Sequence, residues 1–227
     1  MPLGKTLPKP NAILCISAHW QTRGTQVCAV EHPKTIHDFG VFPAELFAQQ
    51  YPAPGAPEYA KLVCDLLPNK IKSTLDWGLD HGAWSILQSL FPNADIPVFQ
   101  LSLDVDLNFS EHFKLAKQLA GLRKMGIMIL GSGNIVHNLG KLNIQGKKPN
   151  WAIAFDNYVK EALESDNEIA LLDINHAGTS ASLSVPTDEH YLPLLYIVAD
   201  KLADDYLLFL TESFDLGSLS MRSVIYQ

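Results

Sequence analysis

The amino-acid sequence predicts an α/β fold: a single domain with a mainly parallel or mixed central sheet flanked by helices. Short apolar runs alternate with helical patterns along the first half of the chain, which is typical of strands joined by crossover helices. The 227 residues are 47% hydrophobic and 18% charged, which suffices for one sizeable core. The proline-rich connector at residues 51–57 is too short to separate domains, so we expect residues 1–227 to form one unit.

The first strand is expected over Ala12 to Ala18, because an apolar run without strict alternation fits a strand covered on both faces. A turn signal separates it from a second strand over Gln26 to Val30, which either pairs with the first as a hairpin or lies next to it in one sheet. A short helix follows at Ala44 to Gln50. Pro57 is well placed to begin a helix over Glu58 to Leu67.

Strand and helix then alternate regularly as far as residue 130. The predicted elements are a strand at Ile71 to Leu75, a helix at His81 to Phe91, a strand at Pro97 to Leu103, a helix at Glu111 to Met125 and a strand at Gly126 to Leu130. Ser110 is the expected N-cap of the second of these helices, whose apolar residues recur at helical spacing.

The second half of the chain is less regular. Residues 138–150 are rich in glycine and lysine and predict a loop or lid, and residues 175–180 also have the composition of a loop. Pro193 suits the first turn of an apolar helix, which places His190 at or just before the start of that helix. The remaining predicted elements are helices at Trp151 to Glu164 and Leu194 to Leu202 and strands at Tyr206 to Leu210 and Ser218 to Ile225.

Charge and cysteine usage narrow the classes of partner. The net charge is -7 and the basic residues are scattered, which argues against a nucleic-acid partner. We find neither a signal peptide nor an apolar run of bilayer length, so no membrane partner is expected. Cys15, Cys28 and Cys64 form no CxxC pair, which favours a reducing, cytoplasmic setting.

The histidines, eight in all, differ in their surroundings. His32 and His112 have polar neighbours and are expected at the surface, whereas His37 and His176 lie in loops and are weaker candidates. The others lie at junctions between elements, where sites are commonly built: His19, His81, His137 and His190. Neutral imidazoles that converge at one rim of a sheet suit Zn(II) or Fe(II), although spacing alone does not establish convergence.

Each junction histidine also has a structural interpretation. His19 either caps the end of its strand or binds a ligand there, and Asp80 either orients an imidazole or His81 caps the following helix. The glycine-rich turn before His137 lets backbone approach a ligand closely. Acidic neighbours of His190 either support a metal ligand or favour a helix N-terminus. HExxH, GxSxG and GxGxxG are absent, so the residues predict a histidine-rich site and no further chemistry.

Several longer motifs carry a resemblance over nearly the whole chain. In order they are Ser17-Ala-His-Trp20, Ile36-His-Asp-Phe-Gly40, Tyr51-Pro-Ala-Pro-Gly55, Gly78-Leu-Asp-His-Gly82, Gly133-Asn-Ile-Val-His-Asn138, Glu189-His-Tyr-Leu-Pro-Leu-Leu195 and Gly217-Ser-Leu-Ser-Met221. Together these motifs resemble the bacterial DOPA-dioxygenase branch of the class III extradiol ring-cleavage dioxygenases. Each is modest alone, but their joint order is specific.

The resemblance implies a non-haem metal site that uses O₂ to open the ring of a catechol beside its two hydroxyl groups. His19 and His190 match metal ligands of the family. His137 matches a histidine of the metal site that acts as the acid/base, and His81 matches a residue of the pocket that meets the substrate. Fe(II) is the metal that oxygen chemistry needs, but an all-histidine site also holds Zn(II).

One departure from the family pattern bears on activity. Family members begin with a further strand that ends in Gly-His-Gly-Ser-Pro, whose histidine is a metal ligand, and the resemblance implies that residues 1–227 are a catalytic domain truncated before it. A missing ligand weakens metal binding, and a missing strand exposes a sheet edge, which favours a homo-oligomer or low stability.

The sequence therefore leaves three hypotheses. The main one is a metal-dependent extradiol dioxygenase that acts on a catechol-type aromatic substrate with O₂. The alternative is a metal-poor, inactive family member or fragment that serves as a binding or interaction module. A zinc hydrolase on the same scaffold has only the cluster of histidines in its support.

Overall fold

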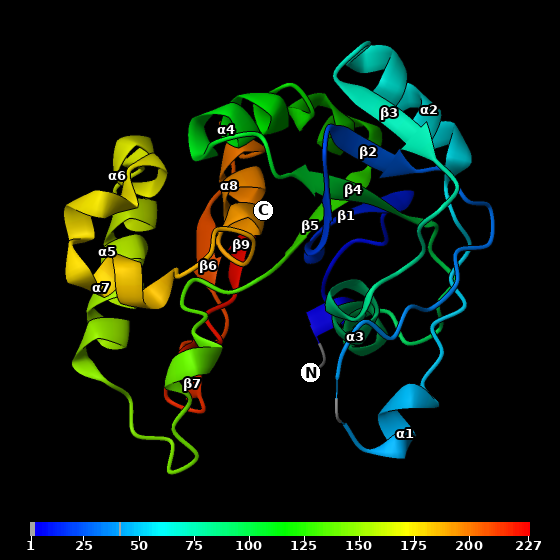
Figure 1. Ribbon diagram of the computed structural model, residues 1–227. Helices are drawn as coiled ribbons and strands as arrows, with labels where there is room; N and C mark the ends of the chain where they lie inside the picture. Colours follow the sequence, from blue (N-terminus) through cyan, green and yellow to red (C-terminus); the bar gives the residue numbers. More distant parts are fainter. Residues whose placement is uncertain (1–2, 41) are drawn as a thin grey trace.

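The computed structural model describes residues 3–40 and 42–227, and its centre is a five-stranded sheet in the order β3-β2-β4-β1-β5 (Figure 1). The strands are β1 (Ala12–Thr22), β2 (Thr25–Cys28), β3 (Ile71–Thr74), β4 (Val98–Asp104) and β5 (Ile127–Ser132). β1 is parallel to β4 and β5, and β2 is parallel to β3 but antiparallel to β4. The predicted single-domain α/β fold with a mainly parallel or mixed sheet is confirmed.

The first two strands do not form the hairpin that their sequence allows. β1 is flanked by two parallel partners, β4 and β5, and therefore has no free edge for β2. β2 instead lies on the far side of β4, where Val27 pairs with Leu101. The adjacent position in one sheet, which was the other alternative, is closer to the observed arrangement, with β4 inserted between the two strands.

The helices of the described residues are α1 (Ala44–Phe47), α2 (Pro57–Leu66), α3 (His81–Leu90), α4 (Phe109–Lys117), α5 (Asn150–Glu164), α6 (Glu168–Leu172), α7 (Thr179–Ser184) and α8 (Leu192–Ala199). Among them, α2, α3 and α8 pack directly against strands of the sheet, and α3 and α8 lie on opposite faces of β1. Pro57 and Pro193 lie in the first turns of α2 and α8, as predicted, because proline needs no backbone N–H there. Within the described part of the chain, we find no helix with the length and apolar character needed to span a membrane.

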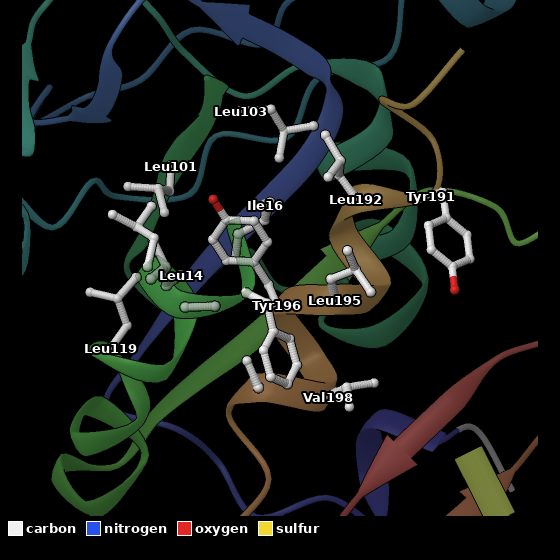
Figure 2. Packing of buried hydrophobic residues seen from close by; sticks show 14 of the residues in the cluster. Leu14, Ile16, Leu101, Leu103, Leu119, Tyr191, Leu192, Leu195, Tyr196 and Val198 are labelled. Atoms are coloured by element: carbon white, nitrogen blue, oxygen red, sulfur yellow. The ribbon is translucent and has the colours of Figure 1, made fainter. Parts of the chain in front are cut away.

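Two cores pack against opposite faces of β1. Leu14 and Ile16 face the larger core, where Leu195 and Tyr196 of α8 pack over them beside residues of α4 (Figure 2). Ile13 and Cys15 face a smaller core, which α3 closes. The expectation that the first strand is covered on both faces is therefore met, since consecutive residues of a strand point to opposite sides.

The predicted helix from Glu111 to Met125 is wrong at both ends. Its N-cap is Asn108, whose side chain accepts a hydrogen bond from the backbone N–H of Glu111 while the Glu111 carboxylate accepts one from the N–H of Asn108. This reciprocal pair starts α4 ahead of Ser110, so Ser110 lies inside the helix. The later residues form a separate 3₁₀ segment, Ala120–Met125, which ends at the left-handed Gly126.

Three further predictions need correction. Residues 174–184 are not simply a loop: they contain a 3₁₀ segment, Ile174–Ala177, and α7, and α6 precedes them unpredicted. Elements of one or two turns are too short to show a helical period in sequence.

The last predicted strand is two strands, and α1 and α8 both end before the predicted Gln50 and Leu202. The late strands, in two separate small ladders, are β6 (Leu207–Phe209) with β9 (Val224–Tyr226) and β7 (Phe214–Asp215) with β8 (Leu219–Ser220).

His112 is buried, so its predicted place at the surface is wrong. Its Nδ1 lies 2.9 Å from the hydroxyl of Tyr196, and its Nε2 lies 3.1 Å from the carbonyl oxygen of Asp104. The helical period of α4 turns His112 and Phe113 toward the core while the polar neighbours face outward. Burial lowers the pKa of His112, so a neutral imidazole ties α4 to α8.

An apolar groove of about 680 Å³ runs along β5, the edge strand of the sheet on that side. Its walls include Leu7 near the N-terminus, Ile129 of β5, Ile197 of α8 and Ile225 of β9, and His190 lies at its margin. The groove therefore connects an unpaired strand edge with one of the junction histidines.

The same groove contains a buried carboxyl group whose ionisation opposes folding. Asp200 is 3% exposed, and its Oδ1 has no hydrogen-bond partner among the described residues. Burial raises the pKa of Asp200 to about 7, although Arg123 acts in the opposite direction. The folded protein therefore holds a proton that the unfolded chain releases near pH 4, and stability declines as pH rises from there to about 7.

Asp200→Asn is expected to remove this pH dependence. Relative to the variant, the free energy of unfolding of the parent protein should fall by up to about 1.4 kcal/mol per pH unit between about pH 4 and pH 7, and then level off. Urea unfolding across this range measures the effect, with Asp65→Asn, whose side chain is 60% exposed, as the control. Parallel pH profiles for Asp200→Asn and the parent would contradict it.

Candidate functional site

The junction histidines converge at the carboxyl-terminal side of β1 and β5. Ring centroids are 3.9 Å apart for His81 and His19, 5.3 Å for His19 and His190, and 3.4 Å for His190 and His137. The last two rings are stacked, with an interplanar angle of 9°. The four imidazoles thus form a row, brought together from β1, the start of α3, the segment after β5 and the segment before α8.

The predicted first strand ends at Ala18, just before His19, but His19 lies within β1. The pairing of β1 with β5 stops at Ser17 and Ser132, and its register with β4 shifts between Ile16 and Gln21. The strand continues to Thr22 because pairing with β4 resumes after this irregularity. His19 therefore lies where β1 has lost one partner, which leaves its ring free to face the other histidines.

Asp80 holds β1 against the start of α3. It is fully buried, and its Oδ1 accepts hydrogen bonds from the hydroxyl of Ser17 at 2.7 Å and the backbone N–H of Ala83 at 3.0 Å. Its Oδ2 accepts one from Gln100 at 2.8 Å. The sequence left open that Asp80 orients an imidazole or that His81 caps the following helix; the cap is Asp80 itself, and His81 is the first residue of that helix.

The glycine-rich turn after β5 approaches the backbone of the segment before α8. A Cβ at Gly133 would lie 2.2 Å from the carbonyl oxygen of His190, and the N–H of Asn134 donates to that oxygen at 2.8 Å. Only glycine allows this contact. The turn fixes the backbone of His190 next to His137, just before α8, where the sequence predicted it.

Asp38 is a site residue that sequence reasoning missed. Its Oδ2 lies 3.3 Å from Nδ1 of His19, and its Oδ1 lies 3.0 Å from Nδ1 of His81 and accepts a hydrogen bond from the His81 N–H at 2.8 Å. Burial opposes ionisation, but the contacts with His81 lower the pKa of Asp38. The signal was present in the motif Ile36-His-Asp-Phe-Gly40, yet a contact across 43 residues cannot be inferred from spacing.

The imidazoles of His19, His137 and His190 are neutral donors. Burial lowers the pKa of His190 to about 3, helped by the neighbouring histidines. Burial is also the main cause that lowers the pKa of His19 and of His137; nearby carboxylates oppose the shift in both cases. At neutral pH these rings therefore present lone pairs, which is the form that binds a metal.

The cluster fits a metal ion on two observations. The donor atoms of His19, Asp38 and His81 all lie within 4.8 Å of one another, and imidazole with carboxylate is a donor set that suits Fe(II) or Zn(II). Nδ1 of His190 is buried without a hydrogen-bond partner among the described residues, a state that costs free energy unless another group compensates it. His37, bonded to the carbonyl oxygen of Gln49, lies outside this row of rings.

Gly82→Ala tests how tightly the site is packed. A Cβ at Gly82 would lie 2.5 Å from Oγ of Ser17 and 2.9 Å from Cδ2 of His19, and Ser17 is fully buried and cannot retreat. We expect the His19 ring to shift, with metal affinity falling about 10–100-fold and stability by about 1–3 kcal/mol. The measurements are metal titration and urea unfolding.

Gly121→Ala is the matched control, because a Cβ there meets nothing within 4 Å. Equal metal affinity in Gly82→Ala and Gly121→Ala would show that the packing around His19 does not position the ring.

A mixed sheet with a row of histidines and a carboxylate at the carboxyl-terminal side of β1 and β5 defines an α/β protein with a metal-type site. The family model for the catalytic LigB subunit of aromatic ring-opening dioxygenase matches residues 4–200. The chain belongs to this family of extradiol ring-cleavage enzymes, and the resemblance drawn from the sequence motifs is confirmed.

Individual relatives agree with this assignment. A 4,5-DOPA dioxygenase extradiol of Escherichia coli (strain K12) is 46% identical over 231 residues, which cover 98% of this chain and 84% of that protein. A protein of the same name from Beta vulgaris is 40% identical and covers 82% of this chain and 71% of its own length. The crystal structure of an uncharacterized protein from Escherichia coli K12 has a TM-score of 0.85 at 40% identity, covering 98% of this chain and 88% of that one.

Proposed function

We propose that this protein is a non-haem, metal-dependent extradiol dioxygenase that opens the ring of a catechol-type substrate with O₂, and that residues 1–227 act as one catalytic domain. The observation that carries the proposal is the row of neutral histidines, in a chain that belongs to the ring-opening dioxygenase family.

The proposed roles follow the chemistry of each residue. His19 and His190 hold the metal, and His137, which the resemblance places in the same metal site, keeps its single lone pair for a proton. His81 contacts the substrate, since it lies beside His19 with its side chain 29% exposed. A bound Fe(II) would supply Lewis acidity toward the catechol oxygens and a redox-active centre through which the catechol can pass electrons to O₂. The crowding of the rings supports this use, because binding a cation relieves the cost of burying their unpaired nitrogens.

His137 is also the proposed acid/base. Its pKa is lowered chiefly by burial, so its ring is unprotonated at neutral pH and able to accept a proton from a catechol hydroxyl. The same nitrogen then returns the proton once the ring has opened. Stacking on His190 keeps the ring in one orientation for both transfers.

Oxygen uptake tests the proposal directly. The protein, first loaded with Fe(II), is expected to consume O₂ and catechol in equal amounts and to form a ring-opened product. A Zn(II)-loaded sample should be inert, because zinc is redox-silent. A phenol with one hydroxyl group is the substrate control. No uptake with catechols from protein that contains stoichiometric iron would contradict the proposed activity.

The alternative function, a metal-poor binding module, is favoured by the apolar groove along β5. An edge strand with unpaired backbone groups tends to recruit another strand, so a homo-oligomer is also expected. Light scattering separates these outcomes from a monomer of 25.1 kDa, and elemental analysis of the purified protein separates iron from zinc and from no metal at all. The free thiols of Cys15, Cys28 and Cys64 support a reducing, cytoplasmic setting.

A further inference from the structure

We propose that Asp38 is a positioning residue: its carboxylate fixes the tautomer and orientation of His19 and His81, and so leaves Nε2 of His19 for the metal and Nε2 of His81 for the substrate. The inference rests on the metal site proposed above. It adds Asp38 to that site as a residue that acts through His19 and His81.

The carboxylate of Asp38 lies between the two rings, with one oxygen facing each of them. Oδ2 lies 3.3 Å from Nδ1 of His19, and Oδ1 lies 3.0 Å from Nδ1 of His81. Nδ1 of His81 is not aligned for a hydrogen bond to Oδ1, but a carboxylate is an acceptor only, so beside either oxygen an Nδ1 that carries the hydrogen is favoured over one that presents a lone pair. In a neutral imidazole the other nitrogen, Nε2, then bears the lone pair. One side chain thus selects the same tautomer in both rings.

The segment that carries Asp38 is held in place independently of the imidazoles. The N–H of Ile36 donates to the carbonyl oxygen of Leu79 at 2.7 Å, and the N–H of Leu79 donates to that of Lys34 at 2.9 Å. The indole N–H of Trp84 donates to the carbonyl oxygen of Ile36 at 2.9 Å. Asp38 is therefore anchored to the start of α3 before any metal binds, as preorganisation requires.

Phe39 supports the arrangement from the next position. Its ring meets the ring of His81 edge to face, with centroids 5.3 Å apart, and packs against the ring of Phe47 at 4.8 Å with a tilt of 53°. The His81 ring is thus confined between Phe39 and His19, and the carboxylate decides which nitrogen faces it.

Direct metal ligation by Asp38 is the competing interpretation, because one ligand atom from each of Asp38, His19 and His81 lies within 4.8 Å of the other two. Two contacts argue against it. Oδ1 already accepts the His81 N–H at 2.8 Å and faces Nδ1 of the same residue, which occupies its lone pairs. Nδ1 of His81 and Nδ1 of His190 are both buried without a hydrogen-bond partner among the described residues, but Nδ1 of His81 already faces Oδ1 of Asp38 at 3.0 Å, so the nitrogen of His190 is left for a cation.

Nitrogen-15 NMR of the histidine rings distinguishes the two interpretations without any turnover. In the metal-free protein, His19 and His81 are expected to be Nδ1–H tautomers, assigned by single histidine replacements. On addition of Zn(II), the Nδ1–H signal of His19 should persist while its Nε2 resonance shifts. A shift of coordination to Nδ1, with loss of that hydrogen, would make Asp38 a direct ligand and overturn the proposal.

Asp38→Asn and Asp38→Leu supply the second test. Asparagine keeps one acceptor oxygen and leucine none, so the Nδ1–H population of the two rings should decrease in that order. Zinc affinity should fall about 10–100-fold in Asp38→Leu, the usual effect of losing a carboxylate that orients a metal-binding histidine. Asp65→Asn, on the exposed face of α2, is the control for a general loss of charge.

Unchanged tautomers and zinc affinity in both Asp38 variants would refute the role of Asp38. Because these readouts use metal-free and zinc-loaded protein, a failure of the oxygen-uptake experiment leaves them unaffected, and the two proposals can fail separately. A thermal unfolding curve for each variant shows whether the fold is retained.

Discussion

Replacing His190 with alanine is expected to abolish metal binding and with it the oxygen uptake of the protein. The ring of His190 lies between His19 and His137 in the row, and its loss removes one of the two histidines that are proposed to hold the metal. We expect metal affinity to fall by at least about 100-fold, since changes outside the ligands themselves already cost 10–100-fold. His19→Ala should behave in the same way.

The measurement combines metal content with stability. Zn(II) at about 100 times its dissociation constant should raise the free energy of unfolding of the parent by about 2.7 kcal/mol, and this gain should vanish in His190→Ala and His19→Ala. His176→Ala, whose side chain is 67% exposed, is the matched control and should keep both metal and gain. Near-stoichiometric metal in His190→Ala would exclude His190 as a ligand.

The second large effect is expected at the ion pair of Arg222 with Asp156, which fastens the C-terminal segment to α5. The side chains are 4% and 5% exposed, and the guanidinium donates to Asp156 through Nε at 3.1 Å and through Nη2 at 2.5 Å. The hydroxyl of Ser220 also donates to Asp156, and Arg222 reaches Glu212 with Nη1. The buried carboxylate is thus fully paired by residues near the end of the chain.

Arg222→Met should lower the free energy of unfolding by about 3–5 kcal/mol, because it leaves the charge of Asp156 buried and uncompensated. Adding Asp156→Leu should recover most of this loss, since an apolar pair can replace a buried ion pair at little cost. Urea unfolding measures both variants. Lys117→Met removes an exposed pair with Glu168 and should cost less than about 1 kcal/mol. If Arg222→Met costs no more than Lys117→Met, the buried pair contributes little.

The four histidines of the site were identifiable because each lies at a junction that local patterns mark. His190 precedes an apolar helix with proline in its first turn, and His81 lies where a helix is expected to start, both readable from neighbours in sequence. His112 shows the limit of this reasoning. Its neighbours are polar, but the face that α4 turns toward α8 is set by tertiary packing, and His112 lies on that face.

Asp80 and Asp38 also differ in whether their roles depend on local sequence or on contacts between distant residues. Asp80 caps a helix that starts at the next residue, so its role depends on local backbone geometry. Asp38 acts on His19 and His81, which are far from it in the chain, and its role depends on the segment around Ile36 pairing with Leu79. A motif can mark such a residue, but it cannot show which atoms it meets.

The sequence by itself determined the fold class, the course of the main strands and helices, the histidines of the site and the family to which the chain belongs. These follow from apolar periodicity, capping residues and ordered motifs, all of which act over a few residues. Only the tertiary structure decided that β4 separates β1 from β2, that Asp38 joins the site and that the imidazoles form a row. Those features depend on strand order and on contacts between distant residues, which are fixed by the packing of the whole chain and by no local pattern.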